Sequence, residues 1–204
     1  VEDVIYHTRS VSRGLQRAFL VADMPFMSYS DPNQALENAV RLMQEGGAMM
    51  VKLEGGEDQI AIVEHLARHD IAVCAHLGLK PQSVHKLGGY KIQGRDPKEA
   101  DKILNNAKAL QDSGADAVLL ECVPNELGKS IKENLDVPVI GIGAGPFVDG
   151  QILVLYDILD VTQGSTPKFV RNFMLDQASP INAIKSYVRA VKNKDYPAPE
   201  HCFS

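Results

Sequence analysis

The stretch Ala48-Met-Met-Val-Lys-Leu-Glu54 decides the fold of this chain. It follows a glycine, is almost continuously apolar and ends in a glutamate. Asp116-Ala-Val-Leu-Leu-Glu121 repeats the same order, and Gly114 precedes its glutamate at the spacing that separates Gly47 from Glu54. Short apolar runs of this kind suit strands buried on both faces of a parallel sheet. The repetition predicts a chain built from successive strand–helix units.

The same pattern extends over the whole sequence. Six strands are expected, at 18–23, 48–54, 71–76, 116–121, 137–143 and 152–156. Apolar spacing and cap residues predict helices within 1–20 and at 32–46, 58–69, 97–114, 125–135, 169–175 and 180–192. The proline-rich tail 196–204 is expected to be irregular.

Alternating strands and helices produce either a doubly wound sheet or a (β/α)8 barrel. A barrel has eight strands and typically about 250 residues. This chain has 204 residues and begins with Val1 rather than Met. We therefore expect an α/β fold of the (β/α)8 TIM-barrel type, a single domain over 1–204 whose first two strands are missing from the sequence.

Composition excludes several classes of protein. Hydrophobic residues make up 45% and charged residues 23%, as in ordinary globular proteins and unlike disordered or collagen-like chains. No apolar run reaches the ~18 residues of a membrane span. Lys and Arg number 21 against 26 Asp and Glu, a net charge of −5 that argues against a nucleic-acid surface. The widely spaced Cys74, Cys122 and Cys202 indicate a reducing compartment and buried thiols rather than disulfides or zinc ligands.

Ionisable residues gather at the predicted strand ends. They are Asp23, Glu54, His76 and Glu121, with Lys52 two residues before Glu54. Active sites of parallel βα folds form at the carboxyl ends of the strands. Because side chains alternate along a strand, Lys52 and Glu54 should point the same way. In a barrel, all five side chains would converge on its mouth.

These residue types suit a metal-assisted reaction in which a bound cation polarises a carbonyl group. Two carboxylates, water and a substrate oxygen are the ligands that Mg²⁺ prefers. A third carboxylate could act as a general base, and a lysine could hold a substrate carboxylate. Structural interpretations stay open: strand-ending acids also cap helices, Lys52 could pair with Glu54 structurally, and His76 could be a rim histidine without a chemical role.

Two glycine-rich segments are less specific. In Gly141-Ile-Gly-Ala-Gly-Pro146 the third glycine comes one residue too early for a dinucleotide fingerprint, so a tight turn after a strand is expected. The segment Leu87–Arg95 carries glycines and two cations. It could be a mobile lid over an anionic substrate or an ordinary loop.

Taken together, the motifs resemble those of the ketopantoate hydroxymethyltransferase (3-methyl-2-oxobutanoate hydroxymethyltransferase) family. The most specific are Ala-Asp-Met-Pro-Phe-Met at 22–27, Met-Val-Lys-Leu-Glu-Gly-Gly at 50–56, Ala-His-Leu-Gly-Leu-Lys-Pro-Gln-Ser at 75–83, Gly-Gly-Tyr-Lys-Ile-Gln-Gly-Arg at 88–95, Leu-Glu-Cys-Val-Pro at 120–124 and Ile-Gly-Ile-Gly-Ala-Gly at 140–145. The resemblance implies a barrel of the phosphoenolpyruvate/pyruvate type. It also implies transfer of a hydroxymethyl group from 5,10-methylenetetrahydrofolate to 3-methyl-2-oxobutanoate, which gives 2-dehydropantoate in the route to pantothenate and coenzyme A.

The resemblance also implies roles for individual residues. Glu121 matches the catalytic proton acceptor, Asp23 and Glu54 match Mg²⁺ ligands, and Asp23, Lys52 and His76 match substrate-binding positions. A Gly-Asp-Ser motif of the family, which supplies a further metal Asp and a substrate Ser, does not occur before Asp23. The resemblance further implies small-molecule substrates and a homodecamer of two pentamers. We also expect a C-terminal segment at about 176–204 that packs on a neighbouring subunit, and a cytoplasmic location (mitochondrial in a eukaryote).

Two other functions remain open from the residues. One is another Mg²⁺-dependent carbon–carbon lyase that acts on 2-oxo acids in the same barrel superfamily. The other is a non-catalytic assembly subunit, which the missing Gly-Asp-Ser motif would suit. A barrel that binds phosphorylated sugars is disfavoured, because the strand ends are acidic.

Overall fold

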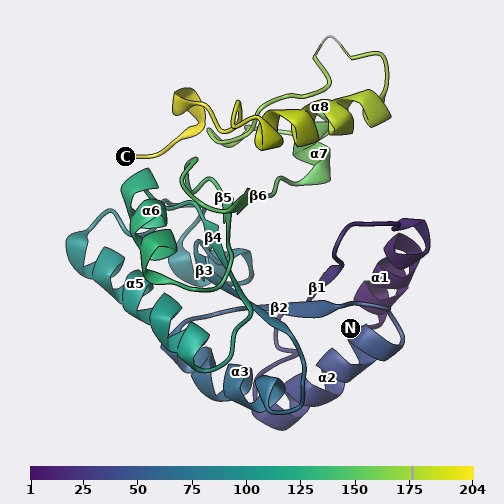
Figure 1. The fold of residues 1–204 in the computed structure, drawn as a ribbon, viewed down its shortest axis with the longest axis vertical. Helices are drawn as coiled ribbons and strands as arrows, with labels where there is room; N and C mark the ends of the chain where they lie inside the picture. Colours follow the sequence, from purple (N-terminus) through teal and green to yellow (C-terminus); the bar gives the residue numbers. More distant parts are fainter. Residues whose placement is uncertain (176) are drawn as a thin grey trace.

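The computed structural model describes residues 1–175 and 177–204, apart from the side chain of Leu87. Its centre is a sheet of six parallel strands in the order β1-β2-β3-β4-β5-β6 (Figure 1). The strands are β1 Val21–Asp23, β2 Met50–Glu54, β3 Val73–Gly78, β4 Ala117–Glu121, β5 Val139–Ile142 and β6 Gly150–Gln151. Neighbours in sequence are neighbours in the sheet, so the order never reverses as it does in a doubly wound fold. The six strands form part of a barrel, with β1 and β6 as its two edges.

Helices cover the outer side of this sheet. In Figure 1, α2, α3, α5 and α6 follow one another around it, and α2–α3, α3–α5 and α5–α6 are in contact. The helices are α1 Glu2–Gly14, α2 Pro32–Gln44, α3 Ile60–Ala67, α4 Val84–Leu87, α5 Pro97–Asp112, α6 Asn125–Asn134, α7 Leu155–Ile158 and α8 Pro180–Lys192.

Local chemistry explains where the longer helices begin. α2, α5 and α8 each start with a proline, which suits the first helical turn. The preceding residue caps each helix with its side chain: Asp31, Asp96 and Ser179 accept hydrogen bonds from backbone N–H groups of the first turn. Such caps satisfy amides that would otherwise lack partners.

Alternation along the strands separates two faces. On β2, Val51 and Leu53 join the core between the sheet and the helices, whereas Met50 belongs to a cluster on the inner face. β3 and β4 repeat the pattern, with Cys74 and Leu119 on the inner face. Residues two apart on a strand share a face. The residues that end β2, β3 and β4 therefore include side chains on the inner face, as the sequence predicts.

The predicted sixth strand at 152–156 is wrong. β6 lies earlier, at Gly150–Gln151, where these residues pair with Ile140 and Gly141. Residues 155–158 form α7 instead. The apolar run 152–156 is largely exposed among the described residues, so its hydrophobic character does not mark a buried strand. The connection from β5 to β6 also contains no helix, contrary to the expected alternation.

The helix predicted around 169–175 is also wrong. Residues Phe169 and Phe173 are buried, but the backbone there follows turns. The Asn172 side chain accepts hydrogen bonds from the amides of Met174 and Leu175 and donates one to Asp160. Side-chain bonds of this kind compete with the helical pattern of backbone bonds.

The C-terminal part packs over the carboxyl ends of β4 and β5. α8 follows the predicted boundaries, while residue 176, where the predicted C-terminal segment begins, lies outside the described residues. The Phe203 carbonyl accepts a hydrogen bond from the amide of Asn125 at 2.9 Å, and the Phe203 ring lies near Gly143. Over 1–175 and 177–204, every helix is too short or too polar to traverse a lipid bilayer.

Candidate active site

The sheet register places the five predicted residues at one rim. Asp23 pairs with Lys52 across β1 and β2, and Glu54 pairs with His76 across β2 and β3. Glu121 ends β4 opposite Gly78, two residues beyond His76 on β3. All five side chains come from the carboxyl ends of neighbouring strands. The structure therefore brings together the complete set that the sequence singled out.

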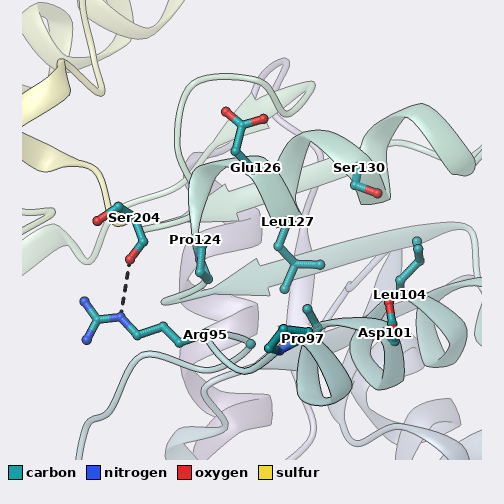
Figure 2. A pocket seen from close by; sticks show the side chains of 11 residues that line it. Arg95, Pro97, Asp101, Leu104, Pro124, Glu126, Leu127, Ser130 and Ser204 are labelled. Carbon is teal, nitrogen blue, oxygen red and sulfur yellow. Dashed lines mark hydrogen bonds between the residues drawn. The ribbon is translucent and has the colours of Figure 1, made fainter.

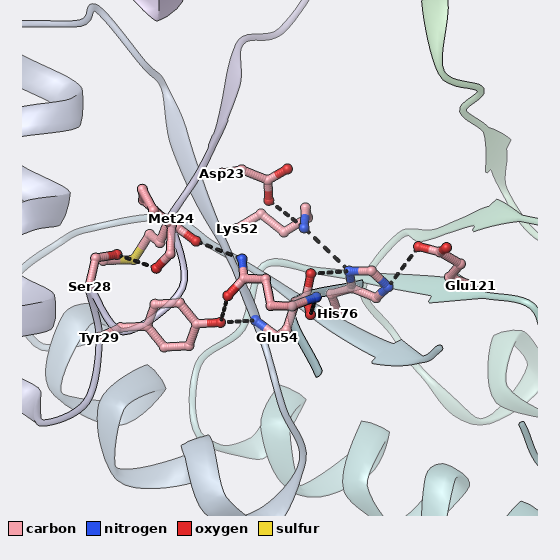
Figure 3. A network of polar contacts seen from close by, with 10 residues as sticks. Asp23, Met24, Ser28, Tyr29, Lys52, Glu54, His76 and Glu121 are labelled. Carbon is pink, nitrogen blue, oxygen red and sulfur yellow. Dashed lines mark hydrogen bonds and ion pairs between the residues drawn. The ribbon is translucent and has the colours of Figure 1, made fainter. Parts of the chain in front are cut away.

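These side chains form a continuous row of polar contacts (Figure 3). The Lys52 ammonium pairs with the Asp23 carboxylate and lies 3.3 Å from His76 Nδ1. That ring nitrogen is 3.9 Å from Glu54 Oε1, and the other nitrogen, Nε2, is 3.3 Å from Glu121 Oε2. The row joins four strands, with the imidazole at its centre.

His76 is buried, with 2% of its surface exposed. A lysine ammonium can only donate, so a neutral His76 accepts at Nδ1 and carries its proton on Nε2, toward Glu121. Within the described part of the chain, Nε2 has no partner in hydrogen-bonding geometry. Its 3.3 Å contact with Glu121 is thus electrostatic rather than a well-aligned hydrogen bond.

Glu54 is the most buried of the three carboxylates. Burial raises its pKa above the ordinary value, because a low-dielectric environment disfavours the charged form. The neighbouring His76 ring, the Lys52 ammonium and the backbone N–H of Gln82 act in the opposite direction and lower this pKa. Asp23 differs, with 58% of its side chain exposed at the rim.

Two residues at this site were missed by sequence reasoning. The Gln82 amide N–H donates to Glu54 Oε2 at 3.0 Å, and its side chain donates from Nε2 to the Met24 carbonyl at 2.9 Å. The Tyr29 hydroxyl lies 2.6 Å from Gln82 Oε1 and 3.3 Å from the Glu54 amide nitrogen. Burial raises the pKa of Tyr29 to about 12, so the phenol keeps its proton at neutral pH. The available signal was the position of Gln82 soon after β3, at the edge where the other strands end.

Backbone geometry sets the direction of Glu121. Cys122, directly after it, has a left-handed φ of 50°, which is uncommon for a residue other than glycine. Gly78 has a φ of 88°, and a Cβ there would lie 2.2 Å from the Glu121 carbonyl oxygen. Only glycine allows β3 and β4 to approach so closely at the rim.

The cysteines beside the site are unreactive. Cys74 and Cys122 are buried and free, and burial raises the pKa of each thiol to about 12. Thiolate is the nucleophilic form, so neither is a nucleophile at neutral pH. This agrees with the expectation that they act as buried apolar residues.

The donor set allows a hard cation but not a closed protein cage. Among residues 1–175 and 177–204, no three His, Cys, Asp or Glu side chains are grouped so as to hold a metal ion. Asp23 and Glu54 offer carboxylate oxygens at one rim, although Asp23 also pairs with Lys52. Mg²⁺ typically keeps several waters and takes one or two protein carboxylates. The residues present therefore fit such an ion if water and substrate complete its coordination.

A cavity lies away from these side chains. It has a volume of about 580 Å³ between α5 and α6 and is lined by Arg95, Leu104, Leu127 and Ser204, among others (Figure 2). Arg95 Nε donates to the Ser204 carbonyl at 3.3 Å.

The 87–95 segment is connected to the rim by a 2.9 Å hydrogen bond from the Gln93 amide to the Cys122 carbonyl. Its role as a lid stays a prediction.

Solved structures share the fold. A Burkholderia cenocepacia protein assigned as a lyase/mutase matches with a TM-score of 0.58 at 13% identity, over 98% of this chain and 77% of that one. Phosphonopyruvate hydrolase matches with a TM-score of 0.53 at 13% identity, over 93% and 76%. Likeness at this level of identity speaks for the architecture alone.

Sequence relatives are much closer. The 3-methyl-2-oxobutanoate hydroxymethyltransferase of Nitrosococcus oceani is 55% identical over 200 residues, which cover 98% of this chain and 76% of the relative. The enzyme of that name from Alkalilimnicola ehrlichii is 56% identical over 203 residues, covering 100% and 73%. The family model described as ketopantoate hydroxymethyltransferase matches residues 1–199. With that match and this degree of identity along its whole length, the chain belongs to the ketopantoate hydroxymethyltransferase family.

Proposed function

We propose that this chain transfers a hydroxymethyl group from 5,10-methylenetetrahydrofolate to 3-methyl-2-oxobutanoate and so forms 2-dehydropantoate in pantothenate biosynthesis. Membership of the family supports the reaction. The observation that carries the proposal is the single row of contacts from Asp23 through Lys52 and His76 to Glu121, with Glu54 beside it. A base, a cation and two further acids within one rim are what enolisation of an oxo acid requires.

Lys52 and His76 bind and orient the oxo acid in this proposal. The Lys52 ammonium is 12% exposed, so it can reach a substrate carboxylate while it stays paired with Asp23. A charge-assisted contact in such a shielded place is stronger than one at the open surface. His76, between Glu54 and Glu121, keeps the acids apart and holds its Nε2 proton toward Glu121.

Asp23 and Glu54 would hold the divalent cation, with Mg²⁺ as the proposed ion. When bound, such an ion supplies Lewis-acid polarisation of the keto group and makes the C3 proton more acidic. The raised pKa of Glu54 means that the charged carboxylate is held in an unfavourable environment when no cation balances it.

Glu121 acts as the general base. Its carboxylate removes the C3 proton of the oxo acid, and the electron pair of that C–H bond passes into the enolate. The enolate carbon then bonds to the methylene carbon of the folate, and both C–N bonds of that carbon break. One is replaced by the new C–C bond and the other by a bond to the oxygen of water, while the C3 proton and one proton of water pass to the two nitrogens and tetrahydrofolate leaves. His76 Nε2 lies 3.3 Å from Glu121 Oε2, so the imidazole is beside the proposed base.

Proton exchange at C3 of the oxo acid in deuterated water tests this role. Glu121→Gln should slow exchange by about 10²- to 10⁴-fold, the usual contribution of a positioned base. Binding of the oxo acid should change little, because Gln keeps the size of Glu. The matched control is Glu126→Gln, an exposed glutamate in α6. Exchange in Glu121→Gln at the wild-type rate would remove Glu121 from the role.

The folate co-substrate and the assembly are further proposals. The folate is supported by family membership. A homodecamer of two pentamers, with the C-terminal segment packed on a neighbouring subunit, rests on the family resemblance and on the apolar side chains that α8 exposes, such as Ile181.

The carbon–carbon lyase remains the second candidate. Its support is the shared fold alone, because the matching structure assigned as a lyase/mutase is only 13% identical. Incubation with methylenetetrahydrofolate and 3-methyl-2-oxobutanoate separates the two. Formation of 2-dehydropantoate supports the transferase, and its absence with the folded protein would favour the lyase or the non-catalytic assembly subunit.

A further inference from the structure

Gln82 occupies a turn that touches three parts of the rim at once. It lies in the 3-10 turn Pro81–Ser83, after the end of β3. Its backbone amide donates to Glu54 Oε2, and its side chain joins the Met24 carbonyl to the Tyr29 hydroxyl. Met24 follows Asp23 directly, so this one residue contacts the Glu54 carboxylate and the backbone next to Asp23. Figure 3 shows Met24, Tyr29 and Glu54 beside one another in this network.

The direction of each bond is determined by its partner. A backbone carbonyl can only accept, so Nε2 of Gln82 must face Met24 and Oε1 must face Tyr29. The Tyr29 hydroxyl donates to Oε1 at 2.6 Å, and its oxygen receives the Glu54 amide at 3.3 Å. The resulting chain runs from the Glu54 backbone through Tyr29 and Gln82 to Met24. Neither Glu nor Met at position 82 could complete it.

From this network we propose that Gln82 is a positioning residue that sets the separation and orientation of the Asp23 and Glu54 carboxylates, acting together with Tyr29. The inference rests on the proposed function, in which these two side chains hold the divalent cation. Partners that orient metal ligands typically change metal affinity by 10- to 100-fold when mutated. Glu121 lies on β4 and receives no hydrogen bond from Gln82 among the described residues.

The test measures Mn²⁺ binding to the full-length protein without substrate. The electron paramagnetic resonance signal of free Mn²⁺ reports how much of the ion is unbound. Gln82→Met keeps the approximate size but removes both side-chain bonds, and the Mn²⁺ dissociation constant should rise by about tenfold or more. The KM for the oxo acid should rise as well. The rise in KM should exceed any fall in kcat at saturating metal and oxo acid, because the base is not held by Gln82.

Two further variants define how the network acts. Gln82→Glu keeps the acceptor for Tyr29 but sets a carboxylate against the Met24 carbonyl, and we expect it to weaken Mn²⁺ binding as well. Tyr29→Phe removes the hydroxyl alone. If Tyr29 and Gln82 act as one chain, the double variant Tyr29→Phe/Gln82→Met should weaken binding by less than the product of the two single effects.

Gln111→Met is the matched control for a purely structural loss. Gln111 Oε1 accepts from the amides of Asp136 and Val137 at 2.7 and 3.2 Å, before β5 begins and thus at the opposite end of the strands. The Gln111→Met variant should have a lower unfolding temperature, but its Mn²⁺ affinity and its KM for the oxo acid should stay within about twofold of wild type.

The outcomes separate the inference from the proposed function. Weaker Mn²⁺ binding in Gln82→Met, at a stability no lower than that of Gln111→Met, supports the inference. Wild-type affinity and KM in both Gln82 variants overturn it while leaving the function intact. A wild-type protein that neither binds Mn²⁺ nor forms product overturns the function and this inference together, since there is then no cation site to position.

Discussion

At the scale of single residues, the site depends on where charge is placed in a shielded rim. Lys52 is the cation shared by Asp23 and His76, and it lies on the strand that also carries Glu54. A partly buried ammonium that interacts with Asp23 and Glu54 reduces the repulsion between these two carboxylates. It also leaves a positive charge available to an anionic substrate.

Lys52→Met should therefore raise the KM for the oxo acid by about 10- to 100-fold, the range expected for loss of a hydrogen bond to a charged group. Steady-state kinetics with varied oxo acid measures it. Lys102→Met is the matched control, because Lys102 forms an exposed pair with Glu57 at 2.7 Å. Equal effects of the two substitutions would contradict the role given to Lys52.

The buried Glu54 makes stability depend on pH in an unusual direction. Its pKa is raised in the folded protein, so the folded state binds the proton more tightly than the unfolded state does. Stability is then lost as the pH rises from the unfolded pKa, about 4.3, through the folded value. Below both values the residue is neutral in either state and there is no penalty.

Glu54→Gln should accordingly raise the Tm at pH 7 to 8, with metal removed by chelation, and the difference should vanish near pH 4. Thermal unfolding followed by circular dichroism across this range checks the sign. Glu64→Gln, an exposed residue of α3, is the control and should show no such pH-dependent gain. A Tm gain for Glu54→Gln that is the same at pH 4 and pH 8 would contradict the burial argument.

At the scale of elements, the rim is formed by the close approach of β3 and β4. The Leu79 amide, just after β3, donates to the Glu121 carbonyl at the end of β4 at 2.8 Å. On the other side of β4, the Cys122 amide donates to the Ile142 carbonyl of β5 at 2.9 Å. The glycine at position 78 permits this approach, because a Cβ would overlap the Glu121 carbonyl. The direction of the proposed base thus depends on a residue of the neighbouring strand.

Gly78→Ala should destabilise the fold by more than about 1 kcal/mol and reduce C3 exchange together with stability. Urea unfolding measures the first effect and deuterium exchange the second. Gly164→Ala is the matched control: its φ of 99° is equally unsuited to alanine, but nothing lies within 4 Å of the added Cβ. The overlap is measured by how much more unfolding free energy Gly78→Ala loses than Gly164→Ala does. Equal losses of unfolding free energy in the two variants would argue against the overlap.

At the scale of the whole molecule, α8 exposes apolar side chains that nothing else in the described chain covers. Ile181 is 65% exposed and Val188 is 43% exposed, whereas Ala183 and Ala190 on the same helix are buried. An exposed apolar patch of this kind is typical of contacts between subunits. It suits the proposed packing of the C-terminal segment on a neighbour.

Ile181→Asp/Val188→Asp should lower the assembly state, measured by sedimentation velocity. Each Asp would place a charge in an apolar contact, which is unfavourable without a partner. The control is Lys185→Asp, a charge change at an exposed polar position of the same helix. Sedimentation identical to wild type in the double variant would show that this face of α8 is not an interface.

Sequence and structure agree where a sequence pattern reflects a local property of the chain, and they differ where long-range contacts decide the conformation. The strands near residues 50 and 118 were predictable because buried parallel strands need continuous apolar runs. The helix starts at Asp31 and Asp96 were predictable because a capping side chain acts on the backbone next to it. The run at 152–156 misled because apolar character does not by itself specify a strand: most of this run is exposed, and residues 155–158 are helical. The turns at 169–175 escaped prediction because Asn172 competes with helix formation through its side chain.

By itself, the sequence determined the repeated strand–helix order and the ionisable residues at the strand ends, because alternation and strand length are local properties of the chain. Only the tertiary structure decided that His76 lies between Lys52 and Glu121, that Gln82 and Tyr29 hold Glu54, and that Gly78 shapes the rim. Those contacts join residues from different strands and turns, and their distances are set by sheet register and close packing, which no local stretch of sequence encodes.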